Sequence, residues 1–193
     1  MKLKRVLQFA QQLLMESIEE GDIVVDATAG NGHDTLFLAQ LVGNQGHVYA
    51  FDVQQQAIEA TTIRLQEAHL QHRVTIIHDG HEQMTDYVQQ PISGAIFNLG
   101  YLPGSDHAII TKSDTTILAI EHLLRIMKVG GIVVLVIYYG HEGGASERDA
   151  VLQFVQQLPQ KYVHVLRYEF INQKNMPPFI IALEKVKHFT SLK

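Results

Sequence analysis

Cysteine and tryptophan are absent from this chain of 193 residues. Without cysteine there is no disulfide framework, no thiolate-bound zinc, no iron–sulfur cluster and no cysteine nucleophile. An excess of positive charge is also lacking, because 15 lysines and arginines face 20 aspartates and glutamates, for a formal net charge of −5. This balance excludes a protein that coats nucleic acid non-specifically but permits a local basic patch.

Long apolar runs are lacking as well. The longest one, from Ile132 to Tyr139, is far shorter than the ~20 residues that cross a bilayer, and the amphipathic N-terminus has no signal-peptide segment. We therefore expect a cytoplasmic protein with no membrane partner. Hydrophobic residues make up 46% of the chain and no Pro/Gly/Ser-rich linker divides it, so we expect one domain over residues 1–193.

Short β-branched runs alternate with helical patterns along the chain. The patterns predict helices over residues 5–18, 34–42, 54–68, 81–88, 115–127 and 146–157, the last capped by Ser146 with Asp149 three residues later. They predict strands over residues 22–27, 47–51, 74–77, 94–97, 132–138, 162–170 and 179–184. Repeated strand–helix units followed by two adjacent strands predict a doubly wound, Rossmann-like α/β sheet of seven strands with a C-terminal antiparallel hairpin. If that edge hairpin is apolar, it also favours a homodimer.

Ligands of such sheets bind beyond the carboxyl ends of the strands, near the switch point between the first and fourth strands. The first predicted strand ends in DATAGNGHD, residues 26–34, where Gly30 and Gly32 allow a tight turn close to a ligand. A plain strand-to-helix turn is the alternative interpretation. The second strand ends in Asp52, whose carboxylate can accept both hydroxyls of a ribose, so the pair favours a nucleoside ligand.

Two nucleoside cofactors, NAD and S-adenosylmethionine, compete for this loop. A dinucleotide fingerprint needs a third small residue where Thr35 stands, and Asp26 would repel a pyrophosphate but suits a cationic ammonium. S-adenosylmethionine is therefore favoured. The residues predicted to contact it are Asp26, Thr28, Gly30, Asn31, Gly32, Asp34, Thr35, Asp52, Val53, Asp79, Gly80, His81 and Asn98. For Asp79, at the end of the third strand, two interpretations stay open: an acceptor for the adenine amine, or the N-cap of a helix that starts at His81.

The fourth strand runs into NLGYLPG, residues 98–104. Asn98 offers an amide oxygen, a backbone carbonyl beyond it offers a second acceptor and Tyr101 offers an aromatic wall, which together describe a pocket for a neutral amine on a flat group. We expect Asn98 to orient the nucleophile and Tyr101 to stack on the base, with a simple turn as the alternative. The residues predicted to bind substrate are Leu99, Gly100, Tyr101, Pro103, Gly104, Tyr139, His141 and Glu142.

His141 and Glu142 follow the fifth strand, where they could accept a proton, face phosphate or stay solvated. The histidines lack metal-ligand spacing, with His78 and His81 as the only near pair, so we expect no metal.

Four segments together resemble the class I S-adenosylmethionine-dependent methyltransferases: DATAGNG, Asp52, Asp79 and NLGYLPG. With IITKSDTTI (109–117) and YYGHEGG (138–144), the chain is similar to a small bacterial family known as rRNA methylases. That family has been associated with the tRNA wobble uridine, where it converts 5-aminomethyl-2-thiouridine to its 5-methylaminomethyl form. The resemblance therefore implies S-adenosylmethionine as cofactor and a tRNA anticodon loop as partner.

Basic residues near both ends of the chain could flank the pocket and hold RNA phosphates, or could form only a solvated surface. They are Lys2, Lys4, Arg5, Lys161, Arg167, Lys174, Lys185 and Lys187. Three alternatives to the tRNA activity stay open: methylation of rRNA, methylation of a small-molecule amine or hydroxyl, and a nucleoside-binding module without chemistry.

Overall fold

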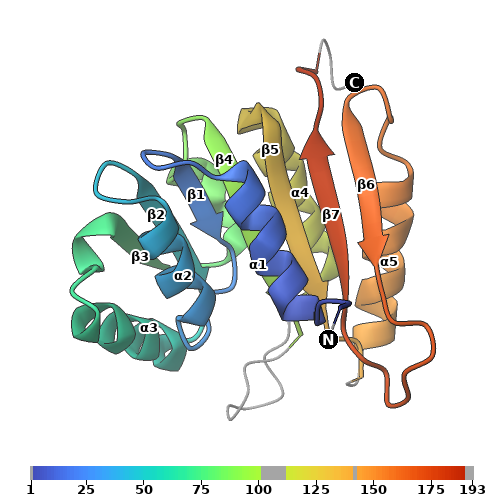
Figure 1. Ribbon diagram of the computed structural model, residues 1–193, viewed down its shortest axis with the longest axis horizontal. Coiled ribbons are helices and arrows are strands. Elements are labelled where there is room, and N and C mark those ends of the chain that lie inside the picture. Colours follow the sequence, from blue (N-terminus) through green and yellow to red (C-terminus); the bar gives the residue numbers. More distant parts are fainter. Residues whose placement is uncertain (1, 101–111, 141–142, 190–193) are drawn as a thin grey trace.

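The computed structural model describes residues 2–100, 112–140 and 143–189, and in these residues a single seven-stranded sheet lies between two layers of helices (Figure 1). The sheet order is β3-β2-β1-β4-β5-β7-β6. The strands are β1 (Ile23–Asp26), β2 (His47–Asp52), β3 (Val74–His78), β4 (Ile92–Leu99), β5 (Met127–Ile137), β6 (Val163–Tyr168) and β7 (Phe179–Lys185). Strands β1 to β5 pair in parallel, and β7 is antiparallel to both β5 and β6. The predicted fold class and the antiparallel C-terminal pair are confirmed.

The helices are α1 (Val6–Ser17), α2 (His33–Leu41), α3 (Gln55–Glu67), α4 (Ser113–Ile126) and α5 (Gly144–Gln156), with short 3₁₀ turns η1 (Gln71–Arg73) and η2 (His81–Asp86). Helices α1, α2 and α3 cover one face of the sheet, and α4 and α5 cover the other (Figure 1). Neighbouring residues of β1 show why both faces are filled. Val24 packs into the core under α1 and α2, whereas Val25 packs into the core under α4, and both are fully buried. Continuous apolar runs are what a parallel strand covered on both faces requires.

Three local predictions are wrong. Residues 81–88 do not form an α-helix, because the segment makes only the 3₁₀ turn η2, which ends at Asp86. Helix α5 starts two residues before the expected cap Ser146, since Gly143 with φ 80° turns the chain into the helix without a side-chain cap. Strand β5 starts at Met127, where a helix was expected to end.

The C-terminal hairpin has one strand inside the sheet and one strand at its edge. Strand β7 pairs with β5 and lies inside the sheet, so its apolar residues are buried. Strand β6 is left as the edge, and residues 164–167 in its middle are exposed. An edge strand keeps one row of backbone groups unpaired. The polar side chains of His164 and Arg167 on it oppose association, whereas Val165 and Leu166, 39% and 46% exposed, favour it. The homodimer stays an untested prediction.

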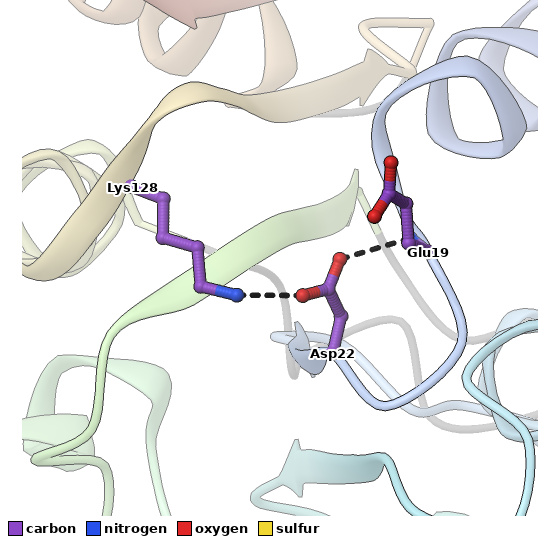
Figure 2. Close-up of polar contacts among 3 residues, drawn as sticks. All are labelled: Glu19, Asp22 and Lys128. Carbon is purple, nitrogen blue, oxygen red and sulfur yellow. Dashed lines mark hydrogen bonds and ion pairs between the residues drawn. The ribbon is translucent and has the colours of Figure 1, made fainter.

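An ion pair joins the start of β1 to the start of β5 (Figure 2). Lys128 Nζ lies 2.6 Å from Asp22 Oδ1, and the backbone N–H of Glu19 donates to Asp22 Oδ2 at 2.9 Å. Partial burial opposes ionisation of Asp22, but the hydrogen bonds from Lys128, Glu19 and Ser93 outweigh it and lower its pKa. This contact joins two strands at the amino edge of the sheet, opposite the loops that follow β1 and β4.

Candidate active site

The loop between β1 and α2 is built on Asp26, a carboxylate with no solvent exposure. The Thr35 hydroxyl donates to Asp26 Oδ2 at 2.6 Å, and the Thr28 backbone N–H donates to Oδ1 at 3.1 Å. Burial raises the pKa of Asp26 to about 7, and the charges of Asp34 and Asp52 add to this rise, while the two hydrogen bonds oppose it. Asp26 thus fixes the loop from its buried side through Thr28 and Thr35, and the carboxyl itself is shielded from solvent.

The two glycines of this loop adopt conformations that side chains disfavour. Gly30 has φ 53° and Gly32 has φ 76°. A Cβ on Gly32 would lie 2.8 Å from the Cα of Thr61 on α3, so the two backbones approach as closely as only glycine permits. The positive φ values agree with the tight turn that the sequence predicts. The close approach seen in the structure is to α3, and the expected approach to a ligand stays a prediction.

Helix α3 holds the outer side of the same loop. The Thr61 hydroxyl donates to the Gly30 carbonyl oxygen at 3.1 Å, and Arg64 Nε donates to the Asn31 carbonyl oxygen at 2.6 Å. Neither α3 residue was identified from the sequence. The sequence did carry one signal for Thr61. This polar residue lies four residues from both Ala57 and Leu65, on the buried face of α3, where an apolar side chain is normal.

Asp52 ends β2 beside the glycine loop. Its Oδ2 accepts the Gly30 backbone N–H at 2.9 Å and its Oδ1 accepts the Gln54 backbone N–H at 2.9 Å. The side chain is half-buried, and each carboxylate oxygen has a second lone pair for a hydroxyl. The next residue, Val53, is 54% exposed, so an acceptor pair and an apolar surface lie together at this strand end.

The loop after β3 uses Asp79 in a way that neither sequence interpretation described. Its Oδ1 accepts the neighbouring Gly80 backbone N–H at 2.8 Å, and its Oδ2 accepts the Tyr87 hydroxyl at 3.0 Å, which raises the pKa of Tyr87. Gly80 is the N-cap of η2 and no side chain caps it. The helix-cap interpretation is therefore wrong, because the expected helix is only a short 3₁₀ turn, and Asp79 ties its two ends together.

His81 follows and packs inward. Its Nδ1 lies 3.1 Å from the Ala27 carbonyl oxygen, and its ring packs edge-on against Phe97. Burial lowers the pKa of His81, so the neutral ring donates through Nδ1. In the described part of the chain, its Nε2 is buried without a hydrogen-bond partner. His81 thus joins the β3 loop to the β1 loop.

Asn98 stands at the end of β4, where its position is fixed twice. Its backbone N–H donates to Thr28 Oγ1 at 2.7 Å, and its side-chain Nδ2 donates to Asp34 Oδ2 at 2.8 Å. Because Asp34 accepts from the amide nitrogen, the orientation of the amide is set and Oδ1 is the end that can accept from a ligand. Asp34 therefore acts as a positioning residue for Asn98, a contact that spans 64 residues of sequence.

Three of the eight predicted substrate residues lie in the described part of the chain. Leu99 is fully buried in the core and its carbonyl accepts the Tyr138 backbone N–H at 2.9 Å, so its side chain cannot face a substrate. Tyr139 packs edge-on against Phe179, with the Arg148 guanidinium 4.8 Å from its ring centroid. Gly100 is buried at the strand end. The remaining predicted residues lie outside the described residues: Tyr101, Pro103, Gly104, His141 and Glu142.

Tyr138 was not identified from the sequence as a site residue. Burial raises the pKa of its phenol, and the nearby charge of Asp34 raises it further. Its hydroxyl therefore stays protonated and contributes to the surroundings of the Asp34–Asn98 pair. Only the pairing of β4 with β5, with Leu99 opposite Ile137, brings the two strand ends together.

These loops fit a ligand that contains adenosine. The glycine loop offers a tight turn at the half-buried Gly30, which has no side chain, and Asp52 offers two acceptor oxygens. Val53 offers an apolar surface and Asn98 an oriented amide oxygen. Among the residues that the structure describes, no three His, Asp or Glu side chains gather as ligands of a metal ion. No helix in the described ranges combines the length and apolar character needed to cross a membrane.

Comparison with known proteins agrees with this geometry. A crystal structure of a methyltransferase from Streptococcus mutans in complex with SAH is 41% identical, with a TM-score of 0.89 over 95% of this chain and 99% of that one. The sheet order and the loops at its carboxyl edge define a class I S-adenosylmethionine-dependent methyltransferase, and S-adenosylmethionine is its cofactor.

The family is shown as well. The family model described as "Putative rRNA methylase" matches residues 48–184, and the chain belongs to that family. A second model, protein-L-isoaspartate(D-aspartate) O-methyltransferase, matches residues 4–91. The crystal structure of an rRNA-methylase of this kind from Clostridium thermocellum is 45% identical, with a TM-score of 0.95 over 96% of this chain and all of that one. A curated relative from Arabidopsis thaliana, named tRNA (mnm(5)s(2)U34)-methyltransferase, chloroplastic, is 35% identical over 94% of this chain and 70% of its own length.

Proposed function

We propose that this enzyme methylates the amine of 5-aminomethyl-2-thiouridine at the wobble position of tRNA, giving the 5-methylaminomethyl nucleoside. The observation that carries the proposal is the fixed amide of Asn98, whose Oδ1 is held as an acceptor at the carboxyl end of β4. The name of the Arabidopsis thaliana relative supports the same substrate. An anticodon loop is single-stranded, so its base can be turned outward into a pocket at small cost.

The chain's part in the reaction is positioning. When bound, S-adenosylmethionine supplies an electrophilic methyl group on a sulfonium. Asn98 Oδ1 accepts one N–H of the neutral substrate amine, which directs the nitrogen lone pair away from the amide and toward the donor. With the donor bound, the new carbon–nitrogen bond would form as the carbon–sulfur bond breaks, S-adenosylhomocysteine would leave, and the resulting ammonium would release one proton to water. Asp34 keeps the acceptor in place throughout because it holds the amide nitrogen.

Asn98→Ala is the variant that tests the proposal. A residue that aims the nucleophile contributes to the transition state more than to cofactor binding. We expect the single-turnover rate on tRNA carrying 5-aminomethyl-2-thiouridine to fall by about a hundredfold or more, with the Kd for S-adenosylhomocysteine nearly unchanged. The wild-type rate should rise with pH until the bound amine is neutral. Nucleoside mass spectrometry measures the product.

Gln89→Ala is a matched control, since Gln89 is an exposed amide that precedes β4 at the far edge of the sheet, and it should keep the wild-type rate. A wild-type rate in Asn98→Ala would refute the role of this residue. A wild type that leaves the nucleoside unmodified but methylates rRNA or a small amine would refute the substrate.

A further inference from the structure

Exposed cations from the two ends of the chain meet at the carboxyl edge of the sheet. The Tyr168 hydroxyl at the end of β6 donates to the Lys4 carbonyl oxygen at 2.8 Å, and the Tyr168 ring stacks on Phe9 of α1 with centroids 4.1 Å apart. These contacts place the N-terminal segment beside the start of the β6–β7 loop, residues 169–178. Figure 1 shows both segments at the lower edge, on the same side as the strand ends that carry the site.

The β6–β7 loop is also adjacent to the segment that follows β5. Ile137, the last residue of β5, pairs with Phe179, the first residue of β7. A Cβ on Gly140 would lie 3.8 Å from the Cβ of Met176, so the loop borders the segment that contains Tyr138 and Tyr139. Lys174, the one cation of this loop, therefore lies in a loop that borders the site.

Among the described residues, the positive charges of the N-terminal segment and the β6–β7 loop form no ion pair, whereas Arg167 before the loop does. No aspartate or glutamate precedes Glu16 in the sequence, and Glu169, the only acid in the loop, pairs with Arg167 at 2.8 Å. Lys2, Lys4, Arg5 and Lys174 are exposed, and in the described part of the chain no carboxylate forms an ion pair with them. Free positive charge thus gathers on the N-terminal segment and the β6–β7 loop, at the same edge of the sheet whose other strand ends carry the carboxylates of Asp34, Asp52 and Asp79.

The other basic residues near the two ends of the chain lie elsewhere. The start of β6 and the end of β7 lie at the amino edge of the parallel strands, opposite the site. Val163 pairs with Lys185 there. Lys185 is 1% exposed, and its ammonium donates to the carbonyl oxygens of Arg125 and Met127 at 3.1 and 2.7 Å. Lys161 and Lys187 are exposed at that far edge. Of the two interpretations of the eight basic residues, the one in which all of them flank the pocket is wrong, because antiparallel β7 carries Lys185 and Lys187 to the opposite edge.

Apolar side chains accompany the free cations. Ile171 is 92% exposed and Met176 is 61% exposed, both in the loop that carries Lys174. Single-stranded RNA presents phosphates at regular intervals and the apolar faces of unpaired bases between them, so it matches this combination. We infer that Lys2, Lys4, Arg5 and Lys174 form an RNA docking edge that holds the backbone phosphates flanking the reacting nucleotide, an inference that rests on the proposed tRNA substrate.

Two double variants with the same change in net charge test the docking edge. Lys4→Ala with Lys174→Ala removes two cations from it, and Lys161→Ala with Lys187→Ala removes two from the far edge. Kd for the substrate tRNA is measured by fluorescence anisotropy from 50 to 300 mM salt, with single-turnover methylation of the same tRNA. We expect the first variant to bind about tenfold more weakly near physiological salt, with a salt slope smaller by about 1.4, and the far-edge variant to match the wild type.

Both variants should keep the wild-type Kd for S-adenosylhomocysteine, which reports that the fold and the cofactor loops are intact. Equal tRNA affinity in the two variants, whether both fall or neither does, would overturn the docking edge while the wild type still methylates tRNA. Failure of the wild type itself to bind or methylate that tRNA would instead overturn the proposed function.

Discussion

At the scale of single residues, Asp26 has the most altered chemistry in the site. It is fully buried, with a pKa raised to about 7, and it stands at the centre of the hydrogen bonds that hold the β1–α2 loop. The folded protein binds this proton more tightly than the unfolded chain, whose carboxyl has its ordinary pKa of 3.8. From about pH 4 to pH 7, this group therefore makes the protein less stable as pH rises.

We predict that Asp26→Asn removes this pH dependence. Relative to the variant, the wild type should lose unfolding free energy between pH 5 and pH 7, at no more than about 1.4 kcal/mol per pH unit. Urea unfolding at pH 5, 6 and 7 measures the difference. Asp149→Asn is the control, because a hydrogen bond from Arg148 lowers the pKa of Asp149 and moves its titration below this range. Parallel pH profiles for wild type and Asp26→Asn would contradict the prediction.

At the scale of elements, the β1–α2 loop is set by its contact with α3 as much as by its own sequence. Gly32 has a positive φ and also lies against the Thr61 backbone. Gly130 in β5 has a similar φ of 86°, but a Cβ added there would meet no atom within 4 Å. Alanine substitutions at Gly32 and Gly130 therefore separate two losses of unfolding free energy: the one from the backbone conformation and the one from the steric contact.

We expect Gly130→Ala to lose roughly 1–2 kcal/mol of unfolding free energy from its positive φ alone. Gly32→Ala should lose that amount and a further ~1–3 kcal/mol, because α2 and α3 must move apart. It should also weaken binding of S-adenosylhomocysteine, which Gly130→Ala should leave intact. Chemical denaturation and calorimetry measure both effects. Equal losses in the two variants would show that α3 does not constrain the loop.

At the scale of the whole molecule, one sheet carries both halves of the site. The ends of β1, β2 and β3 hold the residues predicted to bind cofactor, and the ends of β4 and β5 carry Asn98 and Tyr138. The two cores lie on opposite faces of the same strands. Neither half can unfold without exposing the other, so the chain should behave as a single cooperative unit.

We predict that S-adenosylhomocysteine at a hundred times its Kd stabilises the protein by about 2.7 kcal/mol and raises Tm by about 5–10 °C. Far-UV circular dichroism and tyrosine fluorescence should follow one transition, with or without ligand. The absence of tryptophan makes tyrosine the fluorescent probe. Two transitions, of which only one moves with ligand, would instead divide the chain into independent units.

Short-range patterns in the sequence were sufficient to predict most strands and helices, the fold class and the cofactor. Apolar periodicity predicts the strands and most helices because it reflects which faces of each element are buried, and each segment carries that pattern by itself. The glycine pair predicts a tight turn for a similar reason, since tolerance of a positive φ is a property of one residue. The fold class and S-adenosylmethionine, both confirmed, followed from such short-range signals together with the family resemblance.

Tertiary structure alone decided which distant groups meet. The Asp34–Asn98 contact, the support of the glycine loop by Thr61 and Arg64, and the bond from His81 to Ala27 each join residues on different elements. The insertion of β7 between β5 and β6 likewise separated basic residues that are close in sequence. Periodicity reports that a face is buried but not against what, and the partner of each side chain is determined only when strand order and register bring the elements together.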